Sequence, residues 1–202
     1  MAGGPAEPDR SGKSCLRRYA RRLGGSARND NGDLVQENLR GLPELGRART
    51  VVIYSALPGE VPILDLLVTL GEAGARVVLP RVTKTGLDLH AVRPGDPLRP
   101  GFAGIAEPSP DTARVSPREV DLFCVPGLLF DRAGNRLGRG GAHYDSLLAR
   151  ARGDACRVGV CWDERLVEAV PTDSWDVPMD VVVTEREVIR VVHPSRSDRG
   201  PS

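Results

Sequence analysis

Two short apolar runs, Thr50-Val-Val-Ile-Tyr-Ser-Ala56 and Arg76-Val-Val-Leu-Pro80, decide the fold class of this sequence. Runs rich in valine and isoleucine are typical of buried strands. The segment Pro62–Ala73 between them has a helical pattern, which ends at Gly74. Four apolar side chains share one face of this helix: Ile63, Leu66, Leu67 and Leu70. Together the three segments have the usual size of a parallel βαβ unit, about 30 residues.

The rest of the chain continues this alternation in both directions. Helical patterns precede the βαβ unit at Lys13–Leu23 and Leu34–Leu42. After it we expect strands and one helix, in the order Leu87–Val92, Asp121–Pro126, the helix Ala142–Ala151, Arg157–Cys161, Asp180–Thr184 and Val188–Val192. The alternation indicates an α/β fold with a mainly parallel sheet. Because such sheets bind ligands beyond the carboxyl ends of their strands, the loop after Pro126 is a candidate binding loop.

The length of the chain suits one domain with a substantial core, since it has 202 residues. We expect this domain to span residues 13–192, with a disordered N-terminal tail over residues 1–12 and a C-terminal tail over residues 193–202. Residues Arg93–Pro117 are rich in proline and glycine and show little periodicity. Because long loops of this kind are usually functional, we expect the segment to cover a site.

Composition gives no support to several classes of function. The 28 basic and 27 acidic residues leave a net charge of +1, which gives no argument for nucleic acid or for an anionic membrane surface. No apolar stretch has the roughly 18 residues of a membrane helix. The N-terminus lacks the apolar core of a signal peptide, so we expect a cytoplasmic protein. The four cysteines have no metal-binding spacing, and reduced, buried thiols are the simplest interpretation.

The richest chemical signal is Arg136-Leu-Gly-Arg-Gly-Gly-Ala-His-Tyr-Asp145. Its glycines let backbone amides approach an anion, and a helix that begins directly after them favours negative charge at its N-terminus. Arg136 and Arg139 add forked donors that suit phosphate oxygens. Asp145 adds a carboxylate that would hold Mg²⁺ beside those phosphates. The loop therefore predicts a site for a nucleotide phosphate and an ATP-using enzyme.

The spacing of this loop matches neither a Walker loop nor a dinucleotide-binding fingerprint. An ordinary turn before a helix, with Asp145 satisfying the helix dipole, is therefore the alternative interpretation. Lys13 and Arg17 lie one helical turn apart and would clamp phosphates, or they form a solvated face. Glu60 follows a strand and would accept hydrogen bonds from a heterocycle, or it is a helix-start acid. Asp173 and Asp176 flank Trp175, and each is either a metal ligand or a turn residue.

The glycine loop and its surroundings resemble the 5-formyltetrahydrofolate cyclo-ligase family, also called methenyltetrahydrofolate synthetases. The long motif of that family is similar to Pro126-Gly-Leu-Leu-Phe-Asp131 followed by Gly134-Asn-Arg-Leu-Gly-Arg-Gly-Gly141 and Tyr144-Asp145. Shorter family motifs occur in the same order. They resemble Lys13-Ser-Cys-Leu-Arg17, Ser55 through Glu60, Leu79-Pro80-Arg81, Gly104-Ile-Ala-Glu-Pro108, and Asp176 before Val181-Val-Val-Thr184. The resemblance covers residues 13–192.

This resemblance implies a three-layer, Rossmann-like fold with helices on both faces of the sheet. It also implies ATP- and Mg²⁺-dependent cyclisation of 5-formyltetrahydrofolate to 5,10-methenyltetrahydrofolate, in which the formyl oxygen is phosphorylated, N10 attacks and phosphate leaves. The implied partner is a small molecule, and the protein is expected to be a monomer or a weak homodimer. We expect the residues to divide by role as follows: catalytic, Arg139, His143 and Tyr144; ATP-binding, Lys13, Arg17, Arg136, Leu137, Gly138, Arg139, Gly140, Gly141, Ala142, His143 and Tyr144; substrate-binding, Ser55, Glu60, Arg139, Gly140, Gly141, Ala142, His143 and Trp175; metal-binding, Asp145 and Asp176.

Three positions depart from the family pattern. Ala142 stands where the family has glycine, His143 where it has tyrosine, and Trp175 where it commonly has histidine. These changes fall where the substrate would be recognised. Two alternatives to folate cyclisation therefore stay open. One is a paralogue that uses the same ATP-dependent carbonyl activation on a non-folate substrate, and the other is a catalytically silent nucleotide- or folate-binding module.

Overall fold

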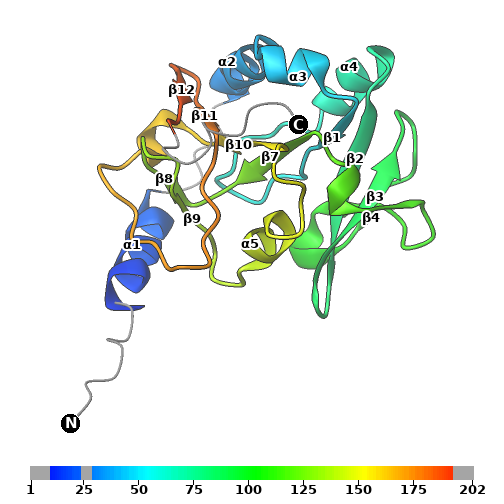
Figure 1. Ribbon diagram of the computed structural model, residues 1–202. Coiled ribbons are helices and arrows are strands. Elements are labelled where there is room, and N and C mark those ends of the chain that lie inside the picture. The colour runs from blue at the N-terminus through cyan, green and yellow to red at the C-terminus, as the bar shows by residue number, and fades with distance from the viewer. Residues whose placement is uncertain (1–9, 24–28, 193–202) are drawn as a thin grey trace.

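The computed structural model describes residues 10–23 and 29–192. In this part of the chain one large sheet forms the centre of the molecule (Figure 1). Its strands follow one another in space as β12 (Val188–Arg190), β11 (Val181–Val183), β10 (Cys156–Val160), β7 (Leu122–Pro126), β1 (Thr50–Val52), β2 (Arg76–Thr83), β3 (Gly86–Val92) and β6 (Arg114–Val115). The five strands from β11 to β2 run parallel, whereas β12 and β3 are antiparallel to their neighbours. The prediction of a mainly parallel sheet is confirmed.

Helices cover both faces of this sheet (Figure 1). On one face lie α2 (Asn29–Arg40), α3 (Pro43–Arg47) and α4 (Leu66–Glu72), and α5 (His143–Leu148) lies on the other. The side chains of β1 alternate between the two layers: Val51 packs under α2–α4, and Val52 packs on the side of α5. The expected three-layer architecture is therefore present.

The first helix, α1 (Arg10–Arg22), packs elsewhere. Its residue Ala20 contributes to a separate apolar cluster with Leu129 and Leu137. These two leucines belong to a small antiparallel hairpin, β8 (Leu129–Phe130) and β9 (Arg136–Leu137). The helix thus packs against the hairpin that leads into the glycine loop.

Several element boundaries differ from those expected. The α1 helix begins at Arg10, so residues 10–12 are helical, whereas the remaining tail residues 1–9 and 193–202 lie outside the described residues. The α2 helix begins at Asn29 rather than Leu34, because its first turn carries no apolar periodicity in the sequence. The α4 helix begins at Leu66 rather than Pro62, since residues 63–68 first form tighter turns with hydrogen bonds between residues three apart.

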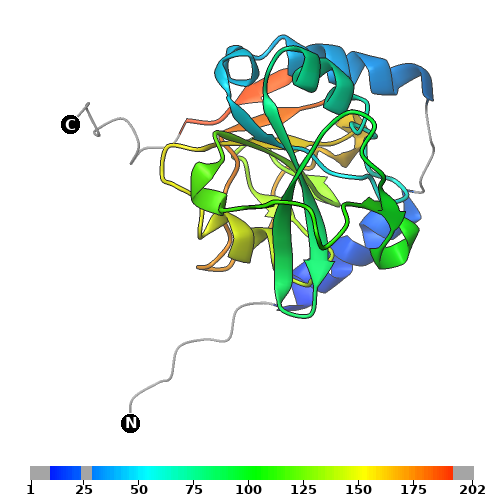
Figure 2. The ribbon, with the colours of Figure 1, turned by 90° about the vertical axis from the view of Figure 1, so that its right-hand side faces the viewer.

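The strand β2 continues past Pro80, where the sequence predicts its end, and forms a long hairpin with β3 (Figure 2). Its pairing with β1 ends at Val78. Proline has no backbone N–H, so at Pro80 no hydrogen bond to β1 is lost. The loop Arg93–Pro117 is less irregular than expected, because it contains the paired strands β4 (Arg99–Pro100) and β5 (Ala106–Glu107) as well as β6.

The cysteines agree in part with the expectation of buried thiols. Cys124 and Cys161 are buried in the sheet region, and burial raises the pKa of the Cys124 thiol to about 12. Cys15, on α1, is exposed instead. Within residues 10–23 and 29–192, no helix combines the length and the apolar character that crossing a membrane requires.

Candidate active site

The order in which the chain adds strands to the sheet reverses between β1 and β7. From β1 it proceeds to β2 and β3 on one side, and it later returns to place β7 and β10 on the other. At such a switch point the loops after two neighbouring parallel strands separate and leave a crevice at their carboxyl ends. The residues after β1 lead to Glu60, and the residues after β7 lead to the glycine loop. The topology therefore brings these two segments together.

A buried carboxylate shapes the approach to the glycine loop. Asp131 is 2% exposed and accepts hydrogen bonds from the backbone amides of Ala133, Asn135 and Val170 and from the Asn135 side chain. These bonds fix the turn between β8 and β9. Because Arg136 comes directly after this turn, Asp131 determines where its side chain begins.

An apolar pocket of about 290 Å³ opens at the switch point. One wall comes from the residues after β1, and another comes from the β2–β3 hairpin. The loop 102–105 and the glycine loop complete it. The main lining residues are Tyr54, Ser55, Leu57, Glu60, Pro80, Val82, Leu87, Phe102, Ile105, Arg139, Gly141, His143 and Tyr144. A mostly apolar pocket with a few polar groups is typical of a site for an organic ligand.

Glu60 is one of two acidic residues that line this pocket, and its side chain is only 7% exposed. Its carboxylate accepts a hydrogen bond of 2.9 Å from the Leu57 amide and lies 3.2 Å from Nε of Arg139. Burial raises the pKa of the Glu60 carboxyl, although these donors oppose the shift. A buried carboxylate of this kind is suited to bind N–H groups of a ligand.

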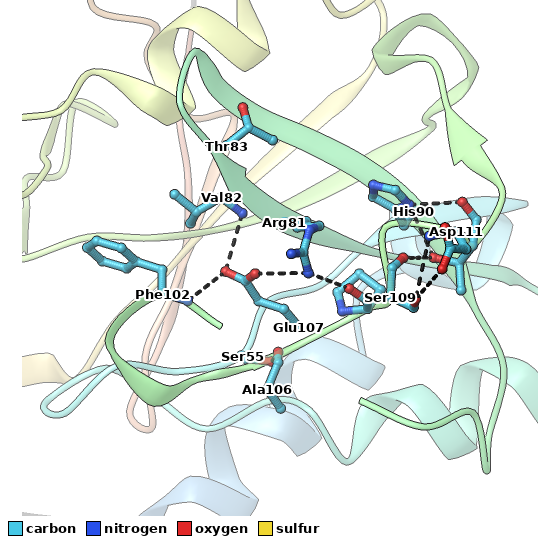
Figure 3. A network of polar contacts seen from close by, with 12 residues as sticks. Ser55, Arg81, Val82, Thr83, His90, Phe102, Ala106, Glu107, Ser109 and Asp111 are labelled. Atoms are coloured by element: carbon cyan, nitrogen blue, oxygen red, sulfur yellow. Dashed lines mark hydrogen bonds and ion pairs between the residues drawn. The ribbon is translucent and has the colours of Figure 1, made fainter. Parts of the chain in front are cut away.

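A second buried carboxylate holds the loop that covers the apolar pocket. Glu107 is 2% exposed and accepts hydrogen bonds from the amides of Val82 on β2 and Phe102 on the loop (Figure 3). Arg81 lies 3.5 Å from the same carboxylate, and Ser55 donates to the neighbouring carbonyl of Ala106. Phe102 is thereby held at the pocket. The expectation that the segment Arg93–Pro117 covers a site agrees with this arrangement.

A polar pocket of about 360 Å³ lies beside the apolar one. Its lining residues are Lys13, Ser14, Arg17, Arg136, Leu137, Gly138, Gly140, Ala142, Asp145, Asp173, Trp175 and Asp176. Lys13 forms ion pairs of 2.6 Å with Asp173 and 2.5 Å with Asp176. Burial lowers the pKa of Lys13, but these two carboxylates outweigh it and leave the pKa raised. The Lys13 side chain is thus a fixed cation within the pocket.

The two pockets share one wall, which consists of Arg136, Gly138, Ala142 and Asp145. Arg136 Nη2 lies 2.9 Å from Asp145 Oδ2, and its guanidinium stands 5.7 Å from the centre of the Tyr144 ring. On the polar side, Arg17 Nε donates to the Gly138 carbonyl at 3.1 Å. A group bound at this wall would contact ligands from both pockets.

The loop backbone uses a conformation that favours glycine. Gly140 has φ of +110°, and Ala142, the residue before α5, has φ of +49°. Left-handed backbone is costly for alanine because its Cβ crowds the carbonyl oxygen. The glycine of the family pattern is therefore the less strained residue at position 142.

Three aspartates line the polar pocket, and they have the oxygen ligands that Mg²⁺ prefers. Asp145 also accepts a hydrogen bond from the Val177 amide, so it lies next to the loop that carries Asp176. In the described part of the chain, no three acidic, histidine or cysteine side chains form a ready-made metal cluster. This is compatible with Mg²⁺, which is commonly bound by one or two carboxylates together with substrate phosphates.

Every residue proposed from the sequence as a site residue lines one of the two pockets. Trp175, expected among the substrate residues, lines the polar pocket and not the apolar one, whereas the expected ATP-binding residues Arg139, Gly141, His143 and Tyr144 line only the apolar one. Gly140 is likewise on the polar side. The Leu137 side chain is buried against α1, so only its backbone is available to a ligand.

Sequence reasoning missed several residues that shape the site. Asp131 and Glu107 lie inside the quoted family motifs, yet as isolated acids they carry no signal of burial. Asp173 was considered as a metal ligand or a turn residue but not as a partner of Lys13, which is 160 positions away. The apolar wall formed by Val82 and Leu87 depends on the β2–β3 hairpin, which the sequence pattern does not define.

Fold and site together define a Rossmann-like α/β protein with a polar, charged pocket beside an apolar one. The sequence model of the 5-formyltetrahydrofolate cyclo-ligase family matches residues 10–185, so the chain belongs to this family, whose members are ATP-dependent ligases. The suspected resemblance is confirmed.

Individual relatives agree with this membership. The 5-formyltetrahydrofolate cyclo-ligase of Mycolicibacterium smegmatis is 34% identical over 88% of this chain and 93% of its own length. The enzyme of the same name from Escherichia coli K12 is 30% identical over 86% of this chain and 98% of its own. The solved structure of Aquifex aeolicus 5,10-methenyltetrahydrofolate synthetase is 34% identical, has a TM-score of 0.78, and is matched over 94% of this chain and 96% of that one.

Proposed function

We propose that this chain catalyses the ATP- and Mg²⁺-dependent cyclisation of 5-formyltetrahydrofolate to 5,10-methenyltetrahydrofolate. The single observation that carries the proposal, beside family membership, is the wall shared by the two pockets. The reaction requires a phosphoryl group to pass from ATP to the formyl oxygen of the folate. A polar pocket and an apolar pocket separated only by Arg136, Gly138, Ala142 and Asp145 provide that proximity.

The folate ring is assigned to the apolar pocket, with Glu60 accepting hydrogen bonds from its N–H groups. Burial favours such a bond, because a hydrogen bond to a carboxylate is electrostatically stronger away from water. Ser55, Gly141 and His143 also line this pocket and would contact the substrate. ATP is assigned to the polar pocket, where Lys13, Arg17 and the glycine-loop amides neutralise its phosphates.

Chemistry then takes place at the shared wall. The formyl oxygen attacks the γ-phosphorus of ATP, and ADP leaves. N10 next attacks the activated formyl carbon and releases its proton to solvent, and inorganic phosphate leaves with the former formyl oxygen to give the methenyl bridge. Arg136 and Arg139 stabilise the charge on the transferring group, which is the main contribution that a protein makes to phosphoryl transfer. Burial raises the pKa of the Tyr144 phenol, so this group stays protonated as a hydrogen-bond donor.

Asp145 and Asp176 are the proposed ligands of Mg²⁺, which would neutralise phosphate charge when bound. Both line the polar pocket, and Asp145 also faces the apolar one. Asp176 is bound to Lys13, so the lysine and the nucleotide-bound metal would share this carboxylate. A cytoplasmic location and a monomer or weak homodimer remain predictions from the sequence.

A second candidate function is the same activation of a carbonyl group on a non-folate substrate. It is favoured by His143 and Ala142, which line the apolar pocket and differ from the family pattern. An imidazole at position 143 is smaller than a phenol ring and can carry charge.

Purified protein incubated with ATP, Mg²⁺ and 5-formyltetrahydrofolate tests the proposal. We expect the near-ultraviolet absorbance of the methenyl product to grow in step with ADP. Absence of this product from a protein that binds ATP would contradict folate cyclisation and leave the second candidate. A parallel reaction without ATP serves as the control, and it should remain silent.

A further inference from the structure

Trp175 has an unusual position for a tryptophan. The chain contains two, of which Trp162 is 6% exposed and Trp175 is 58% exposed. Among the described residues, two exposed aromatic side chains lie in the pockets. Phe102 lines the apolar pocket, and Trp175 lines the polar pocket. The polar pocket is otherwise lined by three basic and three acidic side chains together with small residues and Leu137, so the exposed indole is its aromatic surface.

The turn that carries Trp175 is held in place despite this exposure. The Asp176 amide donates to the Asp173 carbonyl at 3.0 Å, and the Asp173 amide donates to the Asp176 carboxylate at 2.8 Å. Both carboxylates also bind Lys13 on α1. The backbone at Trp175 is therefore fixed against α1 before any ligand arrives, which lowers the entropic cost of using the indole as a binding surface.

The position of the shared wall orients a bound nucleotide. The phosphoryl group that reacts must lie at this wall, which includes Arg136 and Asp145. Lys13 and Trp175 line the polar pocket but not the apolar one, so both lie beyond the shared wall, with Lys13 as the proposed partner of the phosphates and Trp175 as the exposed aromatic surface of this pocket. A nucleotide with its γ-phosphate at the shared wall extends toward these residues, and the flat base lies at the far end of the phosphate chain.

We infer that Trp175 is the residue on which the nucleotide base stacks, and that it gives this chain its preference for a nucleotide over a bare polyphosphate. The inference rests on the proposed function, because it requires ATP in the polar pocket. A stacked base gains affinity from the face of an indole ring and covers the exposed apolar surface.

Tryptophan fluorescence provides a direct test on the wild-type protein. Because Trp162 is buried and lines neither pocket, a change in emission on adding Mg²⁺-ATP reports mainly on Trp175. We expect Mg²⁺-ATP to quench the emission and Mg²⁺-tripolyphosphate, which lacks a base, to bind without comparable quenching. The quenching should disappear in Trp175→Phe.

Calorimetric titration of variants measures the contribution of the ring. We expect Trp175→Ala to weaken ATP binding by about 5- to 150-fold, the range for loss of one stacked base, and Trp175→Phe to retain most of the affinity. Tripolyphosphate affinity should be the same in the wild type and in both variants. Tyr19→Ala is the matched control, because it removes an exposed aromatic ring that lines neither pocket, and its ATP affinity should be unchanged.

Equal losses of ATP and tripolyphosphate affinity in Trp175→Ala would overturn the inference, since they would place the indole at the phosphates. So would unchanged ATP affinity in this variant. These results are distinguishable from failure of the proposed function. If only the proposed function fails, the wild type binds ATP but forms no methenyl product, and the effect of Trp175 on ATP binding can still be measured. A wild-type chain that binds no ATP would overturn both.

Discussion

Arg139 of the glycine loop lies 3.2 Å from Glu60, which follows strand β1, and so joins the two loops of the switch point across the apolar pocket. The glutamate side chain is 7% exposed and the arginine side chain is 46% exposed. A substrate that binds Glu60 would compete with Arg139 for the carboxylate. The freed guanidinium would then be available to the phosphoryl group at the shared wall. This ion pair thus links substrate binding to the chemistry we propose.

The link predicts different defects for its two partners. Arg139→Ala should lower kcat by about a hundredfold or more, because a donor aimed at the developing charge is lost. Glu60→Ala should instead raise the KM for 5-formyltetrahydrofolate about tenfold or more, since a buried charged partner of the substrate is removed. Steady-state kinetics with each substrate varied in turn would measure both. A pure KM effect for Arg139→Ala would contradict its catalytic role.

The raised pKa of Glu60 predicts a pH dependence of stability. A carboxyl whose pKa is higher in the folded state than in the unfolded state costs stability when ionised. The penalty is absent below the ordinary value of 4.5 and grows as the pH rises from there through the folded pKa. Relative to wild type, Glu60→Gln should therefore become more stable as the pH rises through this window. Urea denaturation at a series of pH values would measure the difference.

A control of opposite sign is available at Glu119. The Ser116 amide and Arg76 hold the pKa of this carboxyl below its usual value. Its favourable contribution is present above the ordinary pKa and is lost as the pH falls. Glu119→Gln should therefore become less stable than wild type as the pH rises. The same trend in both variants would show that Glu60 is not the source of the effect.

Ala142 predicts a stabilising substitution. Its φ of +49° is strained for alanine, whereas glycine adopts it freely. Ala142→Gly should raise the free energy of unfolding by about 0.5–1 kcal/mol, after the greater freedom of glycine in the unfolded chain is subtracted. Ala73→Gly is the matched control, because this exposed residue has φ of −74° and should lose about 0.5–1 kcal/mol. Destabilisation of both variants would argue against strain at position 142.

The metal assignment predicts a shift in the requirement for Mg²⁺. Asp145→Asn should lower turnover about a hundredfold or more and raise the Mg²⁺ concentration that gives half-maximal activity, because a ligand charge is lost. Asp154→Asn, at a side chain that is 77% exposed and lines neither pocket, should leave both values unchanged. A loss of turnover with an unaltered Mg²⁺ requirement would assign Asp145 to positioning Arg136, which it contacts at 2.9 Å.

Local sequence was sufficient for the parts of this protein that depend on neighbouring residues. The short apolar runs of β1 and β7 predicted strands, because strands that are buried on both faces read as continuous apolar segments. The run Arg136–Asp145 predicted an anion-binding loop, because its glycines and arginines act within one short segment. Family motifs extended this to a substrate and a reaction.

The tertiary structure decided which distant segments lie next to one another. Only the strand order shows that the switch point lies between β1 and β7, and only the β2–β3 hairpin creates the apolar wall. The sequence assigned Trp175 to the substrate, whereas the fold places it in the polar pocket beside Lys13, which is bound to Asp173 and Asp176. The physical reason is that periodicity and turn chemistry report on contacts a few residues apart. The two pockets arise from packing between segments that lie far apart in the sequence, such as Glu60 and Arg139 at 79 positions and Lys13 and Asp173 at 160, which no local pattern encodes.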